Sequence, residues 1–491
     1  MHLYEIINGI EFESVKTPDD FEVKKITSSL DDTDENTLYV CIKSVNTSAE
    51  RPFSKINTAH LGAVICDKED APLITQKKII VESTRRALAY LYSKYYQIDY
   101  SKTKFVAVTG TNGKTTTATM IYEILLRTNR TVGFIGTGRI EYMREVFTDK
   151  DYSMTTPDPE MLYKSIKKMQ DRGCRYIVME VSSHAIALEK ISPIPFEVGI
   201  FTNLSPEHMD FHSDIEDYYK TKLRLFKSVK YGIFNSDDPY SRRAMSEVYE
   251  SCQTSCIGII WPADAYARDI ILDGFNGSSY FYKDKKRIFK VNISPVGYYN
   301  VYNSLFAISA SILLDIPAYL VKDAISKIKV IVGRFEIIRS DIYAIIDYAH
   351  TSVAFENILK TVNSTKKSWQ KVITVFGCGG ERDKLKRPEM GRIAEKYSSH
   401  VIVTEDNSRS EPTSKIIEDI LSGMTDLAKR TVITSREDAI RHAILSASVD
   451  DIVLILGKGH EKYLITNTGI RDYNEREIIR SAFEKRLTHR L

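Results

Sequence analysis

The feature that most constrains this chain is an apolar run that leads into a glycine-bearing loop and then into a helix. The run Phe105–Val108 precedes Thr-Gly-Thr-Asn-Gly-Lys-Thr-Thr at residues 109–116, and a helix is predicted from Thr117 to Leu126. A continuous apolar run bounded by glycine is typical of a buried parallel strand. Loop amides and a helix N-terminus together form a concave set of hydrogen-bond donors for phosphate groups. The sequence therefore predicts a nucleotide-phosphate loop on an α/β scaffold.

The residue types in this loop suit ATP and magnesium. Lys114 is expected to reach the β- and γ-phosphates, and the Thr115 hydroxyl to bind Mg²⁺. The spacing departs from the common pattern, because Val108 stands where the first glycine would be. The alternative is a tight strand–helix turn with an incidental lysine, but strand, two glycines, Lys-Thr and helix coincide here. The predicted ATP-binding loop residues are Gly110, Thr111, Asn112, Gly113, Lys114, Thr115 and Thr116.

Similar apolar runs alternate with helical stretches along the rest of the chain. This alternation predicts an α/β fold with doubly wound sheets and helices on both faces. At roughly 150 residues per domain, a chain of 491 residues suggests three domains, which we place at residues 1–100, 101–332 and 333–491. The predicted strands are Thr37–Ile42, Ala63–Cys66, Val132–Ile135, Tyr176–Met179, Val198–Phe201, Tyr231–Phe234, Ala344–Ile346, Val372–Phe376, Val401–Val403, Val432–Ile433 and Ile452–Leu456.

Composition excludes several classes of function. The chain has 68 Lys and Arg against 65 Asp and Glu, a net charge of +3, which argues against nucleic-acid and membrane-surface partners. No apolar stretch is long enough to span a membrane, and the N-terminus lacks the pattern of a secretory signal. Six scattered cysteines fit a reducing compartment. We therefore expect a cytoplasmic protein.

The loop Gly-Thr-Asn-Gly-Lys-Thr-Thr resembles that of the Mur ligases, the ATP-dependent amide-forming enzymes of peptidoglycan precursor synthesis. Motifs at Thr155–Pro159, Met179–His184, Asn203–His212 and Gly377–Asp383 follow in the family's order. They are most similar to the branch that adds the third residue of the stem peptide. The resemblance implies an N-terminal UDP-substrate domain, a central P-loop ATPase-like domain with a parallel sheet, and a Rossmann-like C-terminal domain for the amino acid. It also implies an acyl phosphate made from ATP, and a role in cell wall biogenesis.

The resemblance further implies two Mg²⁺ sites and a catalytic set of Lys114, Glu180, His208 and Lys222. Thr115, Glu180, His208 and Lys222 would hold the metal. Glu180 ends a predicted strand, where α/β proteins place ligand groups; its alternative is a carboxylate facing solvent. Without the resemblance, Lys222 would be interpreted as a solvated surface lysine. In the family the matching lysine is carbamylated by CO₂, and Lys220 is the other nearby candidate for this modification.

Other matches concern the nucleotide. The resemblance places Asn300 and Asn303 near the adenine, although helix N-capping is an alternative for both. Arg334 would neutralise phosphates, Asp347 would accept from the ribose hydroxyls, and His350 would lie near the nucleotide. ATP would then lie between the central and third domains, with hinge closure on binding.

The match to the UDP-substrate site is weaker. Thr155, Thr156 and Ser182 match family contacts, whereas the family's arginine is Lys190 here, which cannot make the same bidentate contact. The family's Asp-Ser-Arg triplet near the uridine is replaced by Thr27–Asp31, without arginine. Ser29, or its neighbour Ser28, is the remaining uridine candidate. A different acceptor therefore stays open.

The last group concerns the incoming amino acid. In the family, Asp-Asn-Pro-Arg marks enzymes that add meso-diaminopimelate, and this chain has Asp-Asn-Ser-Arg at residues 406–409. The distal carboxylate of diaminopimelate suits an arginine fork, and its distal ammonium suits a glutamate. If the incoming amino acid were lysine, which lacks the distal carboxylate, a desolvated arginine would be left unpaired. The predicted amino-acid contacts are Arg382, Asp406, Asn407, Arg409, Gly457 and Glu461.

We therefore expect a monomeric ligase that adds meso-diaminopimelate to UDP-MurNAc-L-Ala-D-Glu. One alternative is a relative that adds lysine or another amino acid, or that uses a different acceptor. A second is a nucleotide-binding regulatory protein without turnover. Such a protein would be marked by loss of Lys114, Glu180 or Lys222, and all three are present.

Overall fold

The computed structural model describes residues 1–16, 19–31, 33–43, 61–74, 77–148, 152, 154–329 and 331–488. The chain divides into two compact units, each built from separate stretches. The first is Met1–Ala107, Arg130–Gly199 and Arg224–Lys230, and the second is Val108–Asn129, Ile200–Leu223 and Tyr231–Leu491. The division into three domains stays a prediction. No helix among the described residues is long and apolar enough to cross a membrane.

The first unit begins with a five-stranded sheet in the order β1-β5-β4-β3-β2. The four strands β2 to β5 are parallel, and β1 pairs with β5 antiparallel. Ser83 caps the helix that follows, because its side chain accepts a hydrogen bond from Arg86 N. The elements are α1 (Leu3–Ile7), β1 (Glu13–Lys16), β2 (Lys25–Thr27), β3 (Thr37–Val40), β4 (Ala63–Cys66), β5 (Lys78–Ile80) and α2 (Thr84–Tyr95). Both strands predicted in this region are confirmed, although β3 ends two residues early.

An 11-stranded sheet follows in the order β16-β15-β14-β13-β12-β11-β6-β10-β7-β8-β9. Three of its strands, β6, β11 and β12, carry residues of both units. All five strands predicted in this region are present. The strands are β6 (Lys104–Thr109), β7 (Val132–Gly136), β8 (Arg139–Tyr142), β9 (Glu145–Val146), β10 (Tyr176–Glu180), β11 (Phe196–Phe201), β12 (Val229–Asn235), β13 (Gln253–Gly258), β14 (Ala265–Leu272), β15 (Ser278–Asp284) and β16 (Ile288–Ile293).

Helices of this region include the one that starts at the phosphate loop. It begins at Lys114, three residues before the predicted start, and it packs on α8. The helices are α3 (Lys114–Arg127), α4 (Pro159–Gln170), α5 (Ser183–Ala187), α6 (Ile215–Leu223), α7 (Pro239–Glu247), α8 (Tyr298–Leu313) and α9 (Ala318–Ser326).

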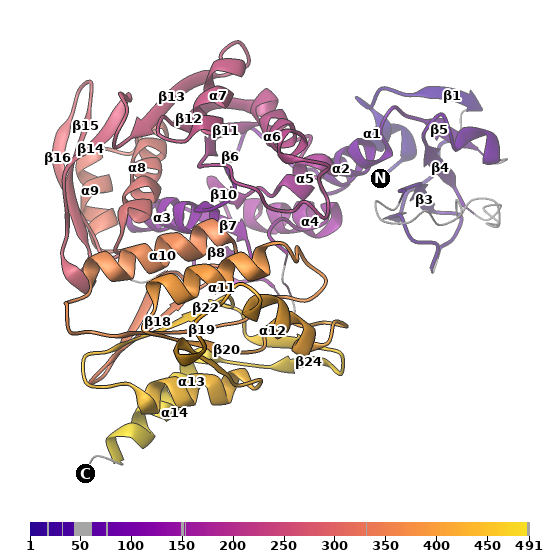
Figure 1. Ribbon diagram of the computed structural model, residues 1–491. Coiled ribbons are helices and arrows are strands. Elements are labelled where there is room, and N and C mark those ends of the chain that lie inside the picture. The colour runs from indigo at the N-terminus through magenta and orange to yellow at the C-terminus, as the bar shows by residue number, and fades with distance from the viewer. Residues whose placement is uncertain are drawn as a thin grey trace. The chain divides into compact units, whose positions relative to one another are not determined.

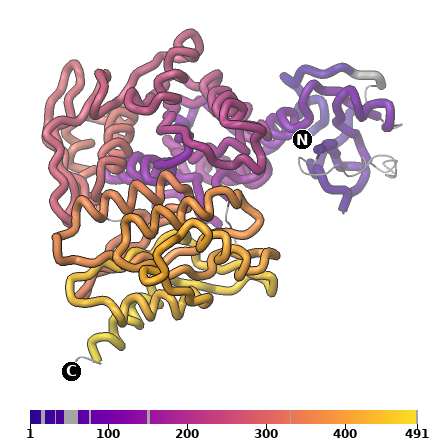
Figure 2. The backbone as a smooth tube through the Cα atoms, viewed as in Figure 1, coloured from indigo at the N-terminus to yellow at the C-terminus, as the bar shows by residue number. Residues whose placement is uncertain are grey.

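The last part of the second unit is a layered α/β body, which the backbone trace of Figure 2 shows in orange to yellow. Its six-stranded sheet has the order β17-β18-β22-β19-β20-β21, parallel except for β17. The elements are β17 (Glu336–Arg339), β18 (Tyr343–Asp347), α10 (Ser352–Thr365), β19 (Val372–Phe376), α11 (Lys386–Tyr397), β20 (His400–Val403), α12 (Thr413–Leu421), β21 (Arg430–Val432), α13 (Arg436–Ser446), β22 (Ile452–Leu456), β23 (Tyr463–Thr466), β24 (Gly469–Asp472) and α14 (Glu475–Thr488).

Helices cover both faces of this sheet. In Figure 1, α10 and α11 lie on one face and α13 and α14 on the other. Two separate apolar clusters fill the two interfaces, one including α10, α11 and α12, the other α13 and α14. All five residues of β19 and of β22 are buried, which explains why these strands are apolar except for Thr374 in β19. The carboxyl ends of β18, β19, β20 and β22 lead into the loops that carry the predicted site residues.

Candidate active site

The phosphate loop begins where β6 ends, and two glycines determine its course. Gly110 has φ +135° and Gly113 has φ +87°, conformations that favour glycine. A Cβ atom on Gly110 would lie 2.0 Å from Thr202 Oγ1, and one on Gly113 would lie 2.5 Å from Asn303 Oδ1. Backbone conformation and close approach therefore both require glycine at these two positions of the predicted loop.

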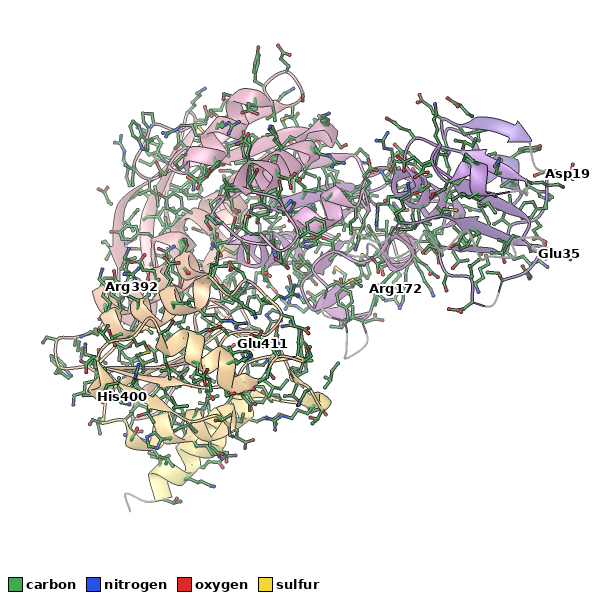
Figure 3. The ribbon with its side chains drawn as sticks, turned by 45° about the vertical axis from the view of Figure 1, so that its right-hand side comes forward. Asp19, Glu35, Arg172, Arg392, His400 and Glu411 are labelled. Atoms are coloured by element: carbon green, nitrogen blue, oxygen red, sulfur yellow. The ribbon has the colours of Figure 1, made fainter. Side chains whose placement is uncertain are left out.

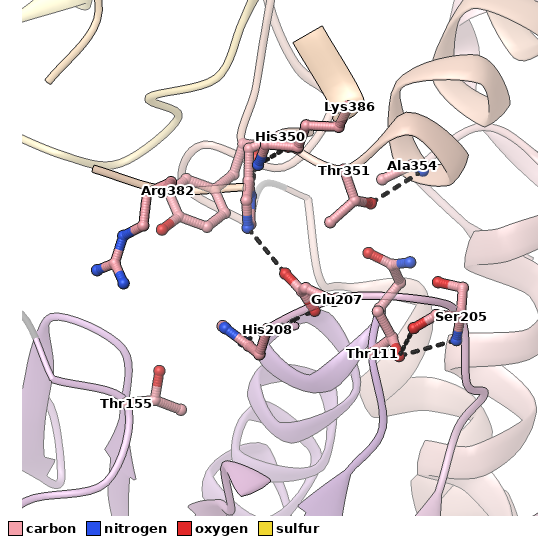
Figure 4. A network of polar contacts seen from close by, with 12 residues as sticks. Thr111, Thr155, Ser205, Glu207, His208, His350, Thr351, Ala354, Arg382 and Lys386 are labelled. Atoms are coloured by element: carbon pink, nitrogen blue, oxygen red, sulfur yellow. Dashed lines mark hydrogen bonds and ion pairs between the residues drawn. The ribbon is translucent and has the colours of Figure 1, made fainter. Parts of the chain in front are cut away.

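Residues that follow β11 hold the loop in place. Thr111 N donates to Asn203 O at 2.9 Å, and Asn112 N donates to Asn203 Oδ1 at 3.0 Å. Ser205 N donates to Thr111 Oγ1 at 3.0 Å, and this hydroxyl donates to Ser205 O at 3.2 Å (Figure 4). The loop is thus fixed before any ligand binds, which lowers the entropic cost of binding a phosphate.

Two cations lie at this loop. Lys114 Nζ donates to the carbonyl oxygens of Gly110 and Thr111 at 2.9 and 2.8 Å. Arg334 Nη2 donates to Thr115 Oγ1 at 3.0 Å. Arg334 Nε is buried without a hydrogen-bond partner among the described residues, and such a donor is costly to leave unpaired. A phosphate oxygen bound at this loop is a natural acceptor for it.

These features fit a phosphate-bearing nucleotide. The N-cap residue of α3 is Gly113, and no side chain caps the helix, so its first amide donors are open to a phosphate. Among the described residues, no group of three or more His, Cys, Asp or Glu could hold a metal ion. The predicted magnesium set is of a different kind, because it includes a threonine hydroxyl and a modified lysine. That set stays a prediction.

Lys222 is buried, so the solvated-lysine alternative is wrong. The residue is 1% exposed, and its Nζ donates to Gly110 O at 3.1 Å. Nζ also lies 4.5 Å from the centre of the Tyr218 ring. Burial, and next the charge of Lys114, lower the pKa of Lys222 well below its usual value. The neutral amine, which is the form that can react with CO₂, is thereby favoured.

A glutamate that the sequence analysis did not select links two predicted residues (Figure 4). Glu207 Oε1 lies 3.1 Å from His350 Nε2, and Glu207 Oε2 lies 3.8 Å from His208 Nε2. His350 O in turn accepts from Lys386 Nζ at 2.8 Å. Burial raises the pKa of Glu207, but the His350 hydrogen bond and the charges of His208, His350 and Lys114 outweigh it and lower the pKa. The only sequence feature that could have indicated Glu207 is its position beside His208 in the Glu-His-Met-Asp motif.

The predicted adenine and ribose residues are buried within a hydrogen-bond network. Asn303 Oδ1 accepts from Thr117 Oγ1 at 3.2 Å, and Asn303 Nδ2 donates to Asn300 Oδ1 at 3.2 Å. Neither asparagine caps α8, whose N-cap is Gly297, so the capping alternative is wrong. Both oxygens of Asp347 accept from backbone amides, at 2.7 and 2.8 Å. Their contact with the nucleotide stays a prediction.

The predicted amino-acid residues gather around a lysine that the sequence analysis did not select. Lys458 is fully buried, and its Nζ donates to Asn407 Oδ1 and to Glu461 Oε2, both at 2.9 Å. Asn407 Nδ2 also donates to Glu461 Oε2 at 2.9 Å, and Asp406 Oδ1 lies 3.7 Å from Lys458 Nζ. A Cβ on Gly457 would lie 2.7 Å from Asp406 Oδ2. The buried Lys458 thus lies beside both carboxylates, Asp406 and Glu461, and the charge of Arg436 also acts on Asp406.

The two predicted arginines differ in their surroundings. Arg409 has φ +54°, and its Nη1 donates to Gly380 O at 2.7 Å and to Asn407 O at 3.2 Å. Within the described ranges, no carboxylate forms an ion pair with Arg409. Arg382 is half exposed and lies 3.7 Å from Asp210 Oδ2. The charge of Arg409 therefore suits a carboxylate brought by a ligand.

Three of the five predicted UDP-substrate residues, Thr155, Thr156 and Ser182, lie around the end of β10 in the first unit. Thr156 Oγ1 donates to Glu180 O at 2.9 Å and accepts from Ser182 N at 3.2 Å. Thr137 N donates to Glu180 Oε1 at 3.0 Å, and Thr155 Oγ1 lies 3.1 Å from Thr137 Oγ1. Glu180 is buried, so the solvent-facing alternative is wrong.

The remaining two predictions lie apart from that group of hydroxyls. Lys190 Nζ pairs with Asp158 Oδ1 at 2.6 Å. Ser29 follows β2, where its hydroxyl donates to Asp31 Oδ2 at 2.8 Å. A role in binding a UDP-substrate stays a prediction for all five residues.

Comparisons with known proteins identify similar families and relatives. Residues 108–311 match the Mur ligase middle domain, and residues 333–459 match the Mur ligase glutamate ligase domain. A protein of Clostridioides difficile named UDP-N-acetylmuramoyl-L-alanyl-D-glutamate–2,6-diaminopimelate ligase is 36% identical, over 99% of this chain and 100% of its own. The protein of the same name from Clostridium perfringens is 35% identical, with the same coverage.

Solved structures agree with this similarity. A structure of a UDP-N-acetylmuramoyl-L-alanyl-D-glutamate–2,6-diaminopimelate ligase is 25% identical, with a TM-score of 0.63 over 90% of this chain and 97% of its own. The folylpolyglutamate synthase of Mycobacterium tuberculosis, at 14% identity, has a TM-score of 0.64 over 76% of this chain and 92% of its own. The second likeness is one of fold alone.

Proposed function

The chain belongs to the Mur ligase family, and we propose that it joins meso-2,6-diaminopimelate to UDP-N-acetylmuramoyl-L-alanyl-D-glutamate with ATP. The observation that carries the proposal is Arg409, a half-buried arginine without a carboxylate partner among the described residues, beside the Asn407–Lys458–Glu461 cluster. An amino acid with a second carboxylate and a second ammonium supplies the charges that this site lacks. Relatives that match over almost the whole chain bear the name of this activity.

The chemistry requires positioning and charge stabilisation more than a protein nucleophile. The γ-phosphoryl group of ATP passes to a substrate carboxylate, giving ADP and an acyl phosphate. The amine then attacks the acyl carbon, the phosphate leaves, and the amine nitrogen loses its proton as the amide forms. Lys114 and the loop amides would stabilise the phosphates, together with Arg334.

Magnesium and a carbamate complete the proposed site. Thr115, Glu180, His208 and Lys222 would hold the metal, with Lys222 carrying a CO₂-derived carbamate. Bound Mg²⁺ would neutralise charge on the transferring phosphoryl group. The burial of Lys222 against Gly110 O supports the carbamate, because an anionic group there would offset the charge of Lys114.

The other substrate contacts are proposed from the family match. Asn300, Asn303, Asp347 and His350 would bind the nucleoside of ATP. Arg382 and Arg409 would bind the distal carboxylate of diaminopimelate, and Asp406, Asn407, Gly457 and Glu461 its distal ammonium. Ser29, Thr155, Thr156, Ser182 and Lys190 would bind the UDP-substrate.

A second candidate is a ligase for a different acceptor. The observation behind it is the ion pair of Lys190 with Asp158 at 2.6 Å. This pairing leaves the lysine less available to an anionic substrate.

The test is phosphate release with each acceptor and each amine in turn. We expect release only with ATP, Mg²⁺, UDP-MurNAc-L-Ala-D-Glu and meso-diaminopimelate together, and little with lysine. Release with another acceptor would favour the second candidate, and release with lysine in preference would contradict the proposed amino acid.

A further inference from the structure

Two loops carry the arginines of the proposed amino-acid site. The first, residues 377–383, follows β19 and holds Arg382; the second, residues 404–411, follows β20 and holds Arg409. Because β19 and β20 are parallel neighbours, both loops leave the same edge of the sheet. They touch closely, since a Cβ on Gly380 would lie 1.9 Å from Ser408 O.

Both loops contain unfavourable backbone conformations that contacts with other parts of the protein must stabilise. Glu381 and Arg409 each have φ +54°, in a region that is unfavourable for residues with side chains. The first loop is also rich in glycine, with Gly377, Gly379 and Gly380, so few of its own side chains can fix it. Some other group must therefore keep Arg382 and Arg409 in position.

A buried arginine on α11 provides this support. The Arg387 side chain is 0% exposed, and its Nη1 and Nη2 donate to the two oxygens of Glu411, both at 2.8 Å. The same guanidinium donates to Asp419 Oδ2 at 2.8 Å and to Gly379 O at 3.1 Å. The Arg387 hydrogen bond, against the opposing effect of burial, lowers the pKa of Glu411 to about 2. One side chain thus connects α11, both loops and α12.

Hydrogen bonds between the loops carry this support to the site. Glu411 Oε2 accepts from Glu381 N at 3.0 Å, and Gly380 N donates to Asn407 O at 2.9 Å. Gly380 O accepts from Arg409 Nη1 at 2.7 Å. The chain of contacts therefore runs from Arg387 through Gly379 and Gly380 to the guanidinium of Arg409.

We propose that Arg387 and Glu411 are positioning residues for amino-acid selection, which set the placement of Arg382 and Arg409 without touching the amino acid. The inference rests on the proposed function. A bidentate buried pair resists rotation in a way that a single hydrogen bond does not. Loosening it shifts the first loop, and Arg409 loses the carbonyl that orients it.

The test compares variants that keep most of the buried contacts. Arg387→Lys keeps the charge but loses the fork, and Glu411→Gln keeps the shape but loses the charge. The matched control is Arg392→Lys, because Arg392 is an exposed arginine on the same helix (Figure 3). Steady-state kinetics would give KM and kcat/KM for meso-diaminopimelate, lysine and ATP, and thermal unfolding would report stability.

We expect Arg387→Lys to raise KM for diaminopimelate about 10- to 100-fold, as displacements of about 1 Å in a site do. KM for ATP should change little, and the preference for diaminopimelate over lysine should fall. The double variant should be no worse than the poorer single one, since both act through one contact. Arg392→Lys should match the unaltered protein.

An unchanged preference in Arg387→Lys would overturn the inference, as would equal increases in KM for ATP and for the amino acid. The proposed function fails on a different result, namely that the unaltered protein does not prefer diaminopimelate to lysine. In that case the positioning role is tested on KM for whichever amino acid the unaltered protein prefers. If Arg387→Lys leaves that KM unchanged, the positioning role is overturned.

Discussion

A lysine ammonium is costly to bury, because it loses the water that solvates its charge. Lys222 is nonetheless buried beside a second lysine, Lys114, and its ammonium donates hydrogen bonds to the Gly110 carbonyl and the Thr109 hydroxyl. Its neighbour Lys220 is exposed, with Glu216 Oε1 3.9 Å away. Sequence spacing alone made both positions candidates on one helix. Burial separates them, and it favours Lys222 as the site of modification.

We predict that Lys222→Ala lowers the rate of phosphate release by at least about 10²-fold, the usual loss when a pre-organised charge is removed from a phosphoryl-transfer site. ATP should still bind, since the loop around Lys114 is intact. A short carboxylic acid should restore part of the rate by occupying the vacated space. Lys220→Ala is the matched control and should retain the rate of the unaltered protein. Full activity in Lys222→Ala would contradict the role.

At the scale of elements, α13, α14 and β22 meet at one buried ion pair. Arg436 is 0% exposed and Glu475 1% exposed, and Arg436 Nε donates to Glu475 Oε1 at 2.8 Å. Arg436 Nη2 also donates to Leu456 O at 2.8 Å. The pair therefore anchors the end of β22, from which the loop with Gly457 and Glu461 departs.

We predict that Arg436→Met destabilises the protein by about 3–5 kcal/mol, because it leaves Glu475 buried without its cation. The double variant Arg436→Met with Glu475→Leu should be less destabilised than this single variant, since neither charge remains. Urea unfolding of both variants measures the difference. Equal losses in the single and double variants would mean that the ion pair itself has no effect beyond packing.

At the scale of the whole molecule, local signals predicted the phosphate loop and most of the parallel strands, but not β2, β5 and β13. The buried runs at β19 and β22 are apolar except for Thr374, and backbone conformation requires glycine at 110 and 113. Both features could therefore be recognised in the sequence. The antiparallel strands β14 to β16 were not predicted, because their burial is irregular and much of their surface is exposed. Glu207, Arg387 and Lys458 were not selected, because burial and partners distant in sequence give them their roles.

Arg409 is proposed to select an amino acid with a distal carboxylate. The measurement is kcat/KM for meso-diaminopimelate and for lysine, with the unaltered protein and with Arg409→Ala. Truncating one member of a desolvated charge pair typically costs about 2–5 kcal/mol, which at about 1.4 kcal/mol per tenfold is roughly 30- to several thousand-fold.

We predict that Arg409→Ala lowers kcat/KM for diaminopimelate by this factor. It should lower kcat/KM for lysine little, because the unaltered protein should already use lysine poorly. The prediction is contradicted if the unaltered protein prefers lysine, or if Arg409→Ala lowers kcat/KM equally for both amino acids.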